Sequence, residues 1–150
     1  MLARTPLHPD DANVYAEIQA FYEYVTTKFD LSRYRCRWFY GHTFEACIRT
    51  GLKSFESGSY YSLEIANINV YPGYQKQGHF SRLLEFAFAL IRPQECLYIE
   101  NVLFMEHGAI YLKRGFTEVV PHYEGSVDIP SYYKVKIGDT KLSPPKFTAT

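Results

Sequence analysis

The sequence predicts an α/β (α+β) fold in which a mixed β-sheet carries helices on both faces. Segments with apolar residues at every second position alternate with segments whose apolar residues recur every three or four positions. Two strand–helix–strand steps in the middle of the chain require parallel strand pairs joined by helical crossovers. The 150 residues are the size of one domain. We therefore expect a single domain over residues 1–150, with residues 138–150 as an irregular tail.

The first half of the chain predicts one helix and one strand, followed by an ambiguous segment. Val14, Ile18 and Val25 lie on one apolar face of a helix expected over residues 11–28, and an Asp at its start would cap it. Residues 32–41 alternate arginines with tyrosine, cysteine and tryptophan, which is typical of a half-buried strand. Residues 42–58 are ambiguous. Residues 43–49 are compatible with a short helix ending at Gly51, and residues 52–55 with a strand.

The second half begins with the clearest strand, over residues 60–71. Its apolar positions move from Leu63 and Ile65 to Ile68 and Val70, and this change of phase predicts a β-bulge at residues 66–67. A helix is expected over 81–91, a strand over 97–102, and a second helix over 106–114 that ends at Gly115. Two last strands are expected over 116–121 and 132–137.

The charge balance argues against a protein that grips nucleic acid over its whole surface. Lys plus Arg equals Asp plus Glu at 16 each, whereas such proteins usually carry a basic excess. A local patch of Arg33, Arg35 and Arg37 remains possible on these grounds, although a solvated strand face is the simpler interpretation.

The remaining composition predicts a cytoplasmic protein without a membrane anchor. No apolar stretch approaches the roughly 20 residues of a membrane span, and the N-terminus lacks the apolar centre of a signal peptide. The three cysteines show no CxxC spacing, which favours reduced thiols: Cys36, Cys47 and Cys96. The five histidines form no HExxH motif, so no metal site is expected.

The junction over residues 72–81 is the first candidate for chemistry. A glycine-bearing turn that leads into a helix leaves backbone N–H groups unpaired, and with the helix dipole they form a site for a pyrophosphate. No Gly-Lys-Ser/Thr of a P-loop follows, and the dinucleotide fingerprint G-x-G-x-x-G is absent.

Within this junction, Gln75-Lys76-Gln77-Gly78-His79-Phe80 resembles the Q/R-x-x-G-x-G/A loop of the GNAT (GCN5-related N-acetyltransferase) superfamily. In one departure, Phe80 stands where the family usually has Gly or Ala. The resemblance implies a mixed, mostly antiparallel sheet with a splayed central parallel strand pair, and acetyl-CoA as co-substrate. It also implies a set of cofactor-binding residues that act mainly through their backbone: Ile68, Val70, Gln75, Lys76, Gln77, Gly78, His79, Phe80, Ser81 and Asn101.

Two further positions match the family and carry its catalytic roles by resemblance. Glu64 lies eleven residues before Gln75, where histone-type members place a general base. Tyr111 lies four residues before Gly115, where the family places the tyrosine that protonates the leaving thiolate. The family's Asn position falls on Phe104, and the nearby Asn101 is the expected replacement.

The resulting expectation is an N-acetyltransferase that moves the acetyl group of acetyl-CoA to an amine of a small molecule or protein by direct attack. Two alternatives stay open: a catalytically silent acyl-CoA-binding module that acts through a partner, and a nucleic-acid-modifying enzyme on the same scaffold. A homodimer through Tyr132 and Tyr133 is a further expectation, based on analogy.

Overall fold

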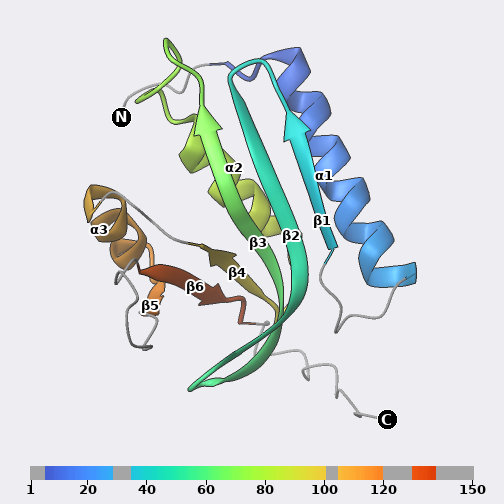
Figure 1. Ribbon diagram of the computed structural model, residues 1–150, viewed down its shortest axis with the longest axis vertical. Helices are drawn as coiled ribbons and strands as arrows, with labels where there is room; N and C mark the ends of the chain where they lie inside the picture. Colours follow the sequence, from blue (N-terminus) through green and yellow to red (C-terminus); the bar gives the residue numbers. More distant parts are fainter. Residues whose placement is uncertain (1–5, 29–34, 101–104, 120–129, 138–150) are drawn as a thin grey trace, which may run out of the picture.

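The protein, seen here in a computed structural model, is described over residues 6–28, 35–100, 105–119 and 130–137 (Figure 1). The helices are α1 (Pro9–Lys28), α2 (His79–Leu90) and α3 (Met105–Lys113), and the strands are β1 (Arg35–Tyr40), β2 (Phe44–Phe55), β3 (Gly58–Val70), β4 (Cys96–Ile99), β5 (Thr117–Val119) and β6 (Ser131–Val135). These elements confirm the order expected from residue 60 onward, and the predicted tail lies outside the described residues.

The sheet is mixed and mostly antiparallel, as predicted. Its order is β1-β2-β3-β4-β6-β5, and only β3 and β4 are parallel. The parallel pairing covers Ser62–Ile65 of β3, whereas β3 runs on to Val70. The two strands therefore part after Ile65, which confirms the predicted splay.

The three helices lie against one face of the sheet, which corrects the expectation of helices on both faces. Tyr15 of α1 contacts both Phe44 of β2 and Phe86 of α2, and Tyr111 of α3 contacts Tyr132 of β6. A row of cross-strand partners puts Phe44 and Tyr132 on the same face: Ile48, Ile65, Ile99. The crossovers through α2 and α3 advance in the same direction across the sheet, so right-handed connections place both helices on one side (Figure 1).

The β-bulge predicted from the change of phase is present in β3. Cys47 pairs with Asn67 and Ile48 pairs with Ile65, so Ala66 is the extra residue. The bulge keeps the apolar side chains of both halves of β3 against the helices, because Leu63 and Ile65 are buried and Ile68 and Val70 pack against the same core.

Residues 43–49 are not helical, because β2 runs through them from Phe44 to Phe55. Both sides of its first half are covered: Ala46, Cys47 and Ile48 are all buried in succession. A short apolar run of this kind has no period that separates a buried strand from a helix. Gly51, expected as a helix end, instead pairs with Ser62, whose hydroxyl donates to the Gly51 carbonyl.

Helix α1 confirms the predicted amphipathic helix, but its aspartates act differently from the expectation. His8 caps the start, since its Nδ1 accepts the N–H of Asp10. Asp11 is buried and its carboxylate accepts hydrogen bonds from the N–H groups of His42 and Thr43 and from the Thr43 hydroxyl. Asp11 therefore fastens α1 to the β1–β2 turn.

The burial of two tyrosines and the lengths of the helices bear on two other expectations. Tyr132 and Tyr133, suggested for a dimer surface, are 4% and 8% exposed and belong to the interior. Among the described residues, none of the helices combines the length and the apolar character needed to cross a bilayer.

Candidate functional site

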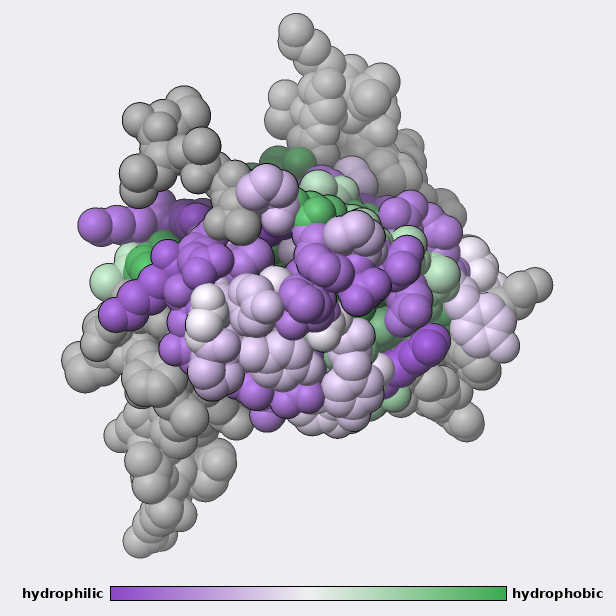
Figure 2. Space-filling model, turned by 90° about the horizontal axis from the view of Figure 1, so that it is seen from above, coloured by the Kyte–Doolittle hydropathy of each residue, from purple (hydrophilic) through white to green (hydrophobic). Residues whose placement is uncertain are grey.

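The β3–α2 junction lies at one end of the molecule and is braced by its own glutamines. Gln75 donates through Nε2 to the Val70 carbonyl (3.0 Å), and Gln77 donates through Nε2 to the Gly73 carbonyl (2.9 Å). Figure 2 views the molecule from this end, where most of the coloured surface is hydrophilic or intermediate. The two glutamine side chains therefore brace the loop from within.

Gly78 gives the junction its open backbone. It is the N-cap of α2 with φ 86° and ψ 7°, a left-handed conformation that favours glycine. A Cβ added at Gly78 would meet no atom within 4 Å, so the space above it is free. Lys76 is also left-handed, with φ 60°, and such alternation turns successive N–H groups toward one concavity.

The first turn of α2 offers backbone N–H donors at the start of a helix. Its first backbone bond runs from the Arg82 N–H to the Gly78 carbonyl (3.0 Å), so the N–H groups of His79 and Ser81 have no acceptor within the helix. The first turn holds no acidic residue. This helix start therefore has the donors and the dipole that suit an anion.

The side chains of His79, Phe80 and Ser81 point back into the protein. His79 is 5% exposed, burial lowers its pKa, and its Nε2 has no hydrogen-bond partner among the described residues. The Ser81 hydroxyl accepts from Arg114 (3.2 Å). Phe80 packs edge-on against Tyr111, with ring centroids 6.0 Å apart. The departure from the family loop thus places a ring directly against the candidate proton donor.

Ile68 and Val70 lie on the part of β3 beyond its pairing with β4. The Tyr71 N–H donates to the Thr43 carbonyl on the β2 side (2.9 Å), and strand alternation turns the backbone groups of Ile68 and Val70 toward the opposite side. The Val70 carbonyl is engaged by Gln75. Asn101 lies outside the described residues.

Glu64 is a fully buried carboxylate on the face of the sheet opposite the helices. Its Oε2 lies 3.8 Å from Arg49 Nε and 3.8 Å from Lys53 Nζ. Burial raises the pKa of Glu64 to about 7, while Lys53 and Arg49 act to lower it and Glu100 to raise it. A carboxylate with a pKa near neutrality has the basicity expected of a general base.

The surroundings of Glu64 include residues that the sequence did not single out. Arg49 donates to Glu100 (2.7 Å) and so lies between two carboxylates. Lys53 Nζ lies 4.4 Å from the ring centre of Tyr98, the cross-strand partner of Glu64. The only sequence signal for Arg49 and Lys53 is their four-residue spacing, which puts both on one face of a strand, on a segment whose strand character was ambiguous.

Tyr111 is buried on the other face, 2% exposed, among the rings of Phe80, Phe116 and Tyr132. Burial raises the pKa of Tyr111 above its ordinary value, so its hydroxyl keeps its proton at neutral pH. Glu64 and Tyr111 are thus not brought into contact: they flank the sheet from opposite faces.

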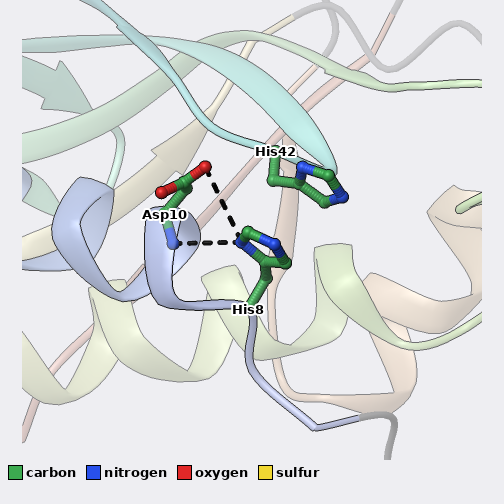
Figure 3. Close-up of side chains that lie close together, drawn as sticks. All are labelled: His8, Asp10 and His42. Carbon is green, nitrogen blue, oxygen red and sulfur yellow. Dashed lines mark hydrogen bonds and ion pairs between the residues drawn. The ribbon is translucent and has the colours of Figure 1, made fainter.

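A group of possible metal ligands appears that the sequence did not suggest. His8, Asp10 and His42 place ligand atoms within 4.8 Å of one another (Figure 3). The two imidazoles are stacked, with centroids 3.7 Å apart and planes at 7°, so their in-plane lone pairs do not converge on one ion. His8 Nδ1 accepts from Asp10, and His42 Nε2 bonds the Tyr74 hydroxyl (3.0 Å). As placed, the group is a hydrogen-bonded stack.

This stack borders a cavity of about 330 Å³ beside the loop. The cavity is lined by residues of the N-terminal segment, the β1–β2 turn and the junction: Pro6, Leu7, His8, Pro9, His42, Thr43, Tyr74, Gln77 and His79.

Of the three arginines predicted to share a strand face, one can be placed. Arg37 is exposed and its guanidinium lies 5.1 Å from the ring centre of Phe39. Arg33 and the side chain of Arg35 lie outside the described part of the chain.

No protein-family model and no curated protein matches the sequence at a significant level. Several solved structures do match it. The AtaT toxin bound to the C-terminus of the antitoxin AtaR and acetyl-CoA is 11% identical, with a TM-score of 0.47, and the match covers 62% of this chain and 58% of that one. The match therefore spans less than two thirds of that structure.

Two further structures overlap more of the chain. A histone acetyltransferase HPA2 and related acetyltransferase from Corynebacterium glutamicum is 11% identical over 89% of this chain and 81% of that one, with a TM-score of 0.44. Arabidopsis thaliana Naa50, in complex with a bisubstrate analogue, is 17% identical over 86% and 82%, with a TM-score of 0.40. These sequence identities and TM-scores are too low to assign a function, which must therefore be argued from this chain's own residues. The chain resembles the GNAT superfamily in its loop motif and its mixed sheet.

Proposed function

We propose that this protein is an N-acetyltransferase that transfers the acetyl group of acetyl-CoA to an amine of a small molecule or protein by direct attack. The observation that carries the proposal is the β3–α2 junction. A strand that has parted from its parallel neighbour leads into a helix start with a left-handed Gly78, free space above it and the N–H groups of the first helical turn. This combination suits a long ligand with a pyrophosphate.

The chain's own groups would divide the binding between them. The N–H groups from Lys76 to Ser81 would hold the pyrophosphate. The backbone of Ile68 and Val70 would pair with the pantetheine arm in the manner of an added strand. Gln75 and Gln77 would contribute by holding the loop in shape, and Asn101 would act from the end of the neighbouring strand.

Glu64 would serve as the general base. The attacking amine must be neutral, and Glu64 would take its proton directly or through a water molecule. The amine nitrogen then bonds to the thioester carbonyl carbon as the bond from that carbon to sulfur breaks. Tyr111, whose raised pKa keeps its hydroxyl protonated, would donate a proton to the departing sulfur. The placement of the two residues on opposite faces fits a transfer across the gap between β3 and β4.

One observation favours a catalytically silent acyl-CoA-binding module as the second candidate. Phe80 lies against Tyr111, so its ring could keep a thioester from the tyrosine hydroxyl while the backbone N–H groups still bind the pyrophosphate. Turnover separates the two functions, since a binding module takes up acetyl-CoA without releasing its thiol.

The experiment is thiol release from acetyl-CoA across a panel of amines between pH 5.5 and 8.5. The N-acetyltransferase proposal expects kcat/KM to rise through about pH 7, where Glu64 loses its proton, and Glu64→Gln to lower it about 10²–10⁴-fold. Glu95→Gln is the matched control, because burial also raises the pKa of Glu95 to about 7, in a turn that precedes β4. Saturable binding with no thiol released from any amine would favour the silent module.

A further inference from the structure

Two of the three cysteines meet across the β1–β2 pair. The Sγ atoms of Cys36 and Cys47 are 2.9 Å apart. Cys36 is the cross-strand partner of Arg49 and Cys47 that of Trp38, so the two cysteines are diagonal neighbours on one face of the sheet. A disulfide bond is about 2.05 Å long. The two sulfur atoms therefore need to approach by only about 1 Å to be joined.

The two thiols differ in access to solvent. Cys36 is exposed, and Cys47 is buried. Burial, together with the hydrogen bond and charge of Cys36, raises the pKa of Cys47 to about 12. A reagent in solution therefore meets Cys36 first, and Cys47 is placed to react second.

The third cysteine provides an internal comparison. Cys96 is buried in β4, and burial raises its pKa to about 12. Cys96 is the strand partner of Ser62 and Val135, so no other cysteine stands opposite it in the described sheet.

Cys47 also occupies a sensitive place in β2. The register with β3 changes between Cys47 and Ile48, opposite the extra residue Ala66. Arg49, the ion-pair partner of Glu64, follows two residues later on the same face as Cys47. A disulfide bond at Cys47 would therefore restrain the stretch of β2 that places Arg49 beside Glu64.

We propose that Cys36 and Cys47 are a reversible modification site, a dithiol that a low-molecular-weight disulfide such as glutathione disulfide converts to an internal disulfide. The Cys36 thiolate attacks one sulfur of glutathione disulfide, forming a mixed disulfide and releasing one glutathione thiolate. Cys47, after losing its proton to solvent, attacks the Cys36 sulfur and releases the second glutathione. Two protein thiols and one glutathione disulfide thus become one protein disulfide and two glutathione thiols.

The first step prepares the second. Once Cys36 is in the mixed disulfide it no longer carries a thiol proton or a negative charge, and both of these act to raise the pKa of Cys47. Cys47 then becomes easier to ionise at the moment when its sulfur is needed. The pair does not depend on the proposed acetyl transfer, because its chemistry uses only these two side chains.

The test exposes the folded protein to buffers of increasing glutathione disulfide, traps free thiols by alkylation and measures intact mass. The expected end product has two fewer alkylated cysteines, no bound glutathione, and a peptide link between Cys36 and Cys47 after digestion. Cys47→Ser is expected to stop at a stable glutathione adduct. Cys36→Ser is expected to form neither adduct nor disulfide, and Cys96→Ser is expected to behave as the wild type.

Three outcomes would overturn the proposal: a wild-type protein that keeps glutathione on Cys36 as its end product, one that links Cys96, or one that remains fully alkylated at every ratio. Thermal unfolding of each variant in reducing buffer checks that it is folded, and the wild-type mass result decides the matter without any variant.

Discussion

Replacing Glu64 by Gln should stabilise the protein at alkaline pH and leave its stability unchanged at acid pH. Glu64 is fully buried and neither carboxylate oxygen has a hydrogen-bond partner among the described residues. Burial raises its pKa from the ordinary 4.5 to about 7. A carboxyl whose pKa is higher in the folded state stabilises the fold below its unfolded pKa, and this contribution is lost as pH rises toward 7.

The size of the effect follows from that pKa. A change of one in pKa corresponds to about 1.4 kcal/mol, so ionisation of Glu64 costs the folded state up to about 3 kcal/mol at pH 8. Lys53 and Arg49 are partly exposed, and solvent relaxation around them reduces the cost. We therefore expect Glu64→Gln to gain about 1–3 kcal/mol at pH 8 and less than about 1 kcal/mol at pH 5, with the gain vanishing below the unfolded pKa.

Thermal unfolding from pH 5 to pH 8 measures this directly. For a chain of this length, about 2–4 °C of Tm accompany each kcal/mol, so the variant should exceed the wild type by several degrees at pH 8. Glu100→Gln is the control, since Glu100 is a partly exposed carboxylate paired with the same Arg49. If Glu64→Gln is destabilised equally at both pH values, Glu64 is a fixed ion-pair partner and the reasoning from burial is wrong.

Three further predictions test the fold and the site. Tyr111→Phe should keep the Tm within about 2–4 °C, an effect of about 1 kcal/mol, and lower kcat at least about 10-fold with acetyl-CoA binding unchanged; a fully active variant would remove Tyr111 from the mechanism. Asp11→Ala should cost about 3 kcal/mol by chemical denaturation, because three hydrogen bonds to the β1–β2 turn are lost, two of them buried. Gly108→Ala should be destabilising by about 1 kcal/mol, since its Cβ would overlap the hydroxyl of the buried Tyr132; a gain in Tm would show that the ring can move.

The features that could be predicted from the sequence are those that depend on residues close together in the chain. The bulge at Ala66 could be placed because the alternation of apolar residues in β3 changes phase there, and this is a property of neighbouring residues. The junction could be placed for the same reason, since Gly78 and the helix after it lie within one short stretch. The left-handed conformation of Gly78 is what a turn into a helix requires.

Features that depend on distant residues could not be predicted. Asp11 resembles a helix cap in sequence, but the fold brings it to His42, 31 positions away. Arg49 meets Glu64 only because β2 and β3 pair in a register set after the bulge. The contact of Phe80 with Tyr111 and the nearness of Cys36 to Cys47 likewise arise from packing between elements. The first half of β2 was missed because both of its faces are covered at Ala46, Cys47 and Ile48, which removes the period of a half-buried strand.

The most direct test of the central claim is the Tm of the protein with and without acetyl-CoA at about 1 mM. With a Kd near about 10 μM, mass action adds about 2.7 kcal/mol, which is a rise of about 5–10 °C. Gly78→Leu should lose this rise, and Gly115→Leu should keep it, because Gly115 has the same φ of 86° at the end of α3 rather than at the junction. No rise in the wild type, or an equal rise in Gly78→Leu, would contradict an acetyl-CoA site at the start of α2.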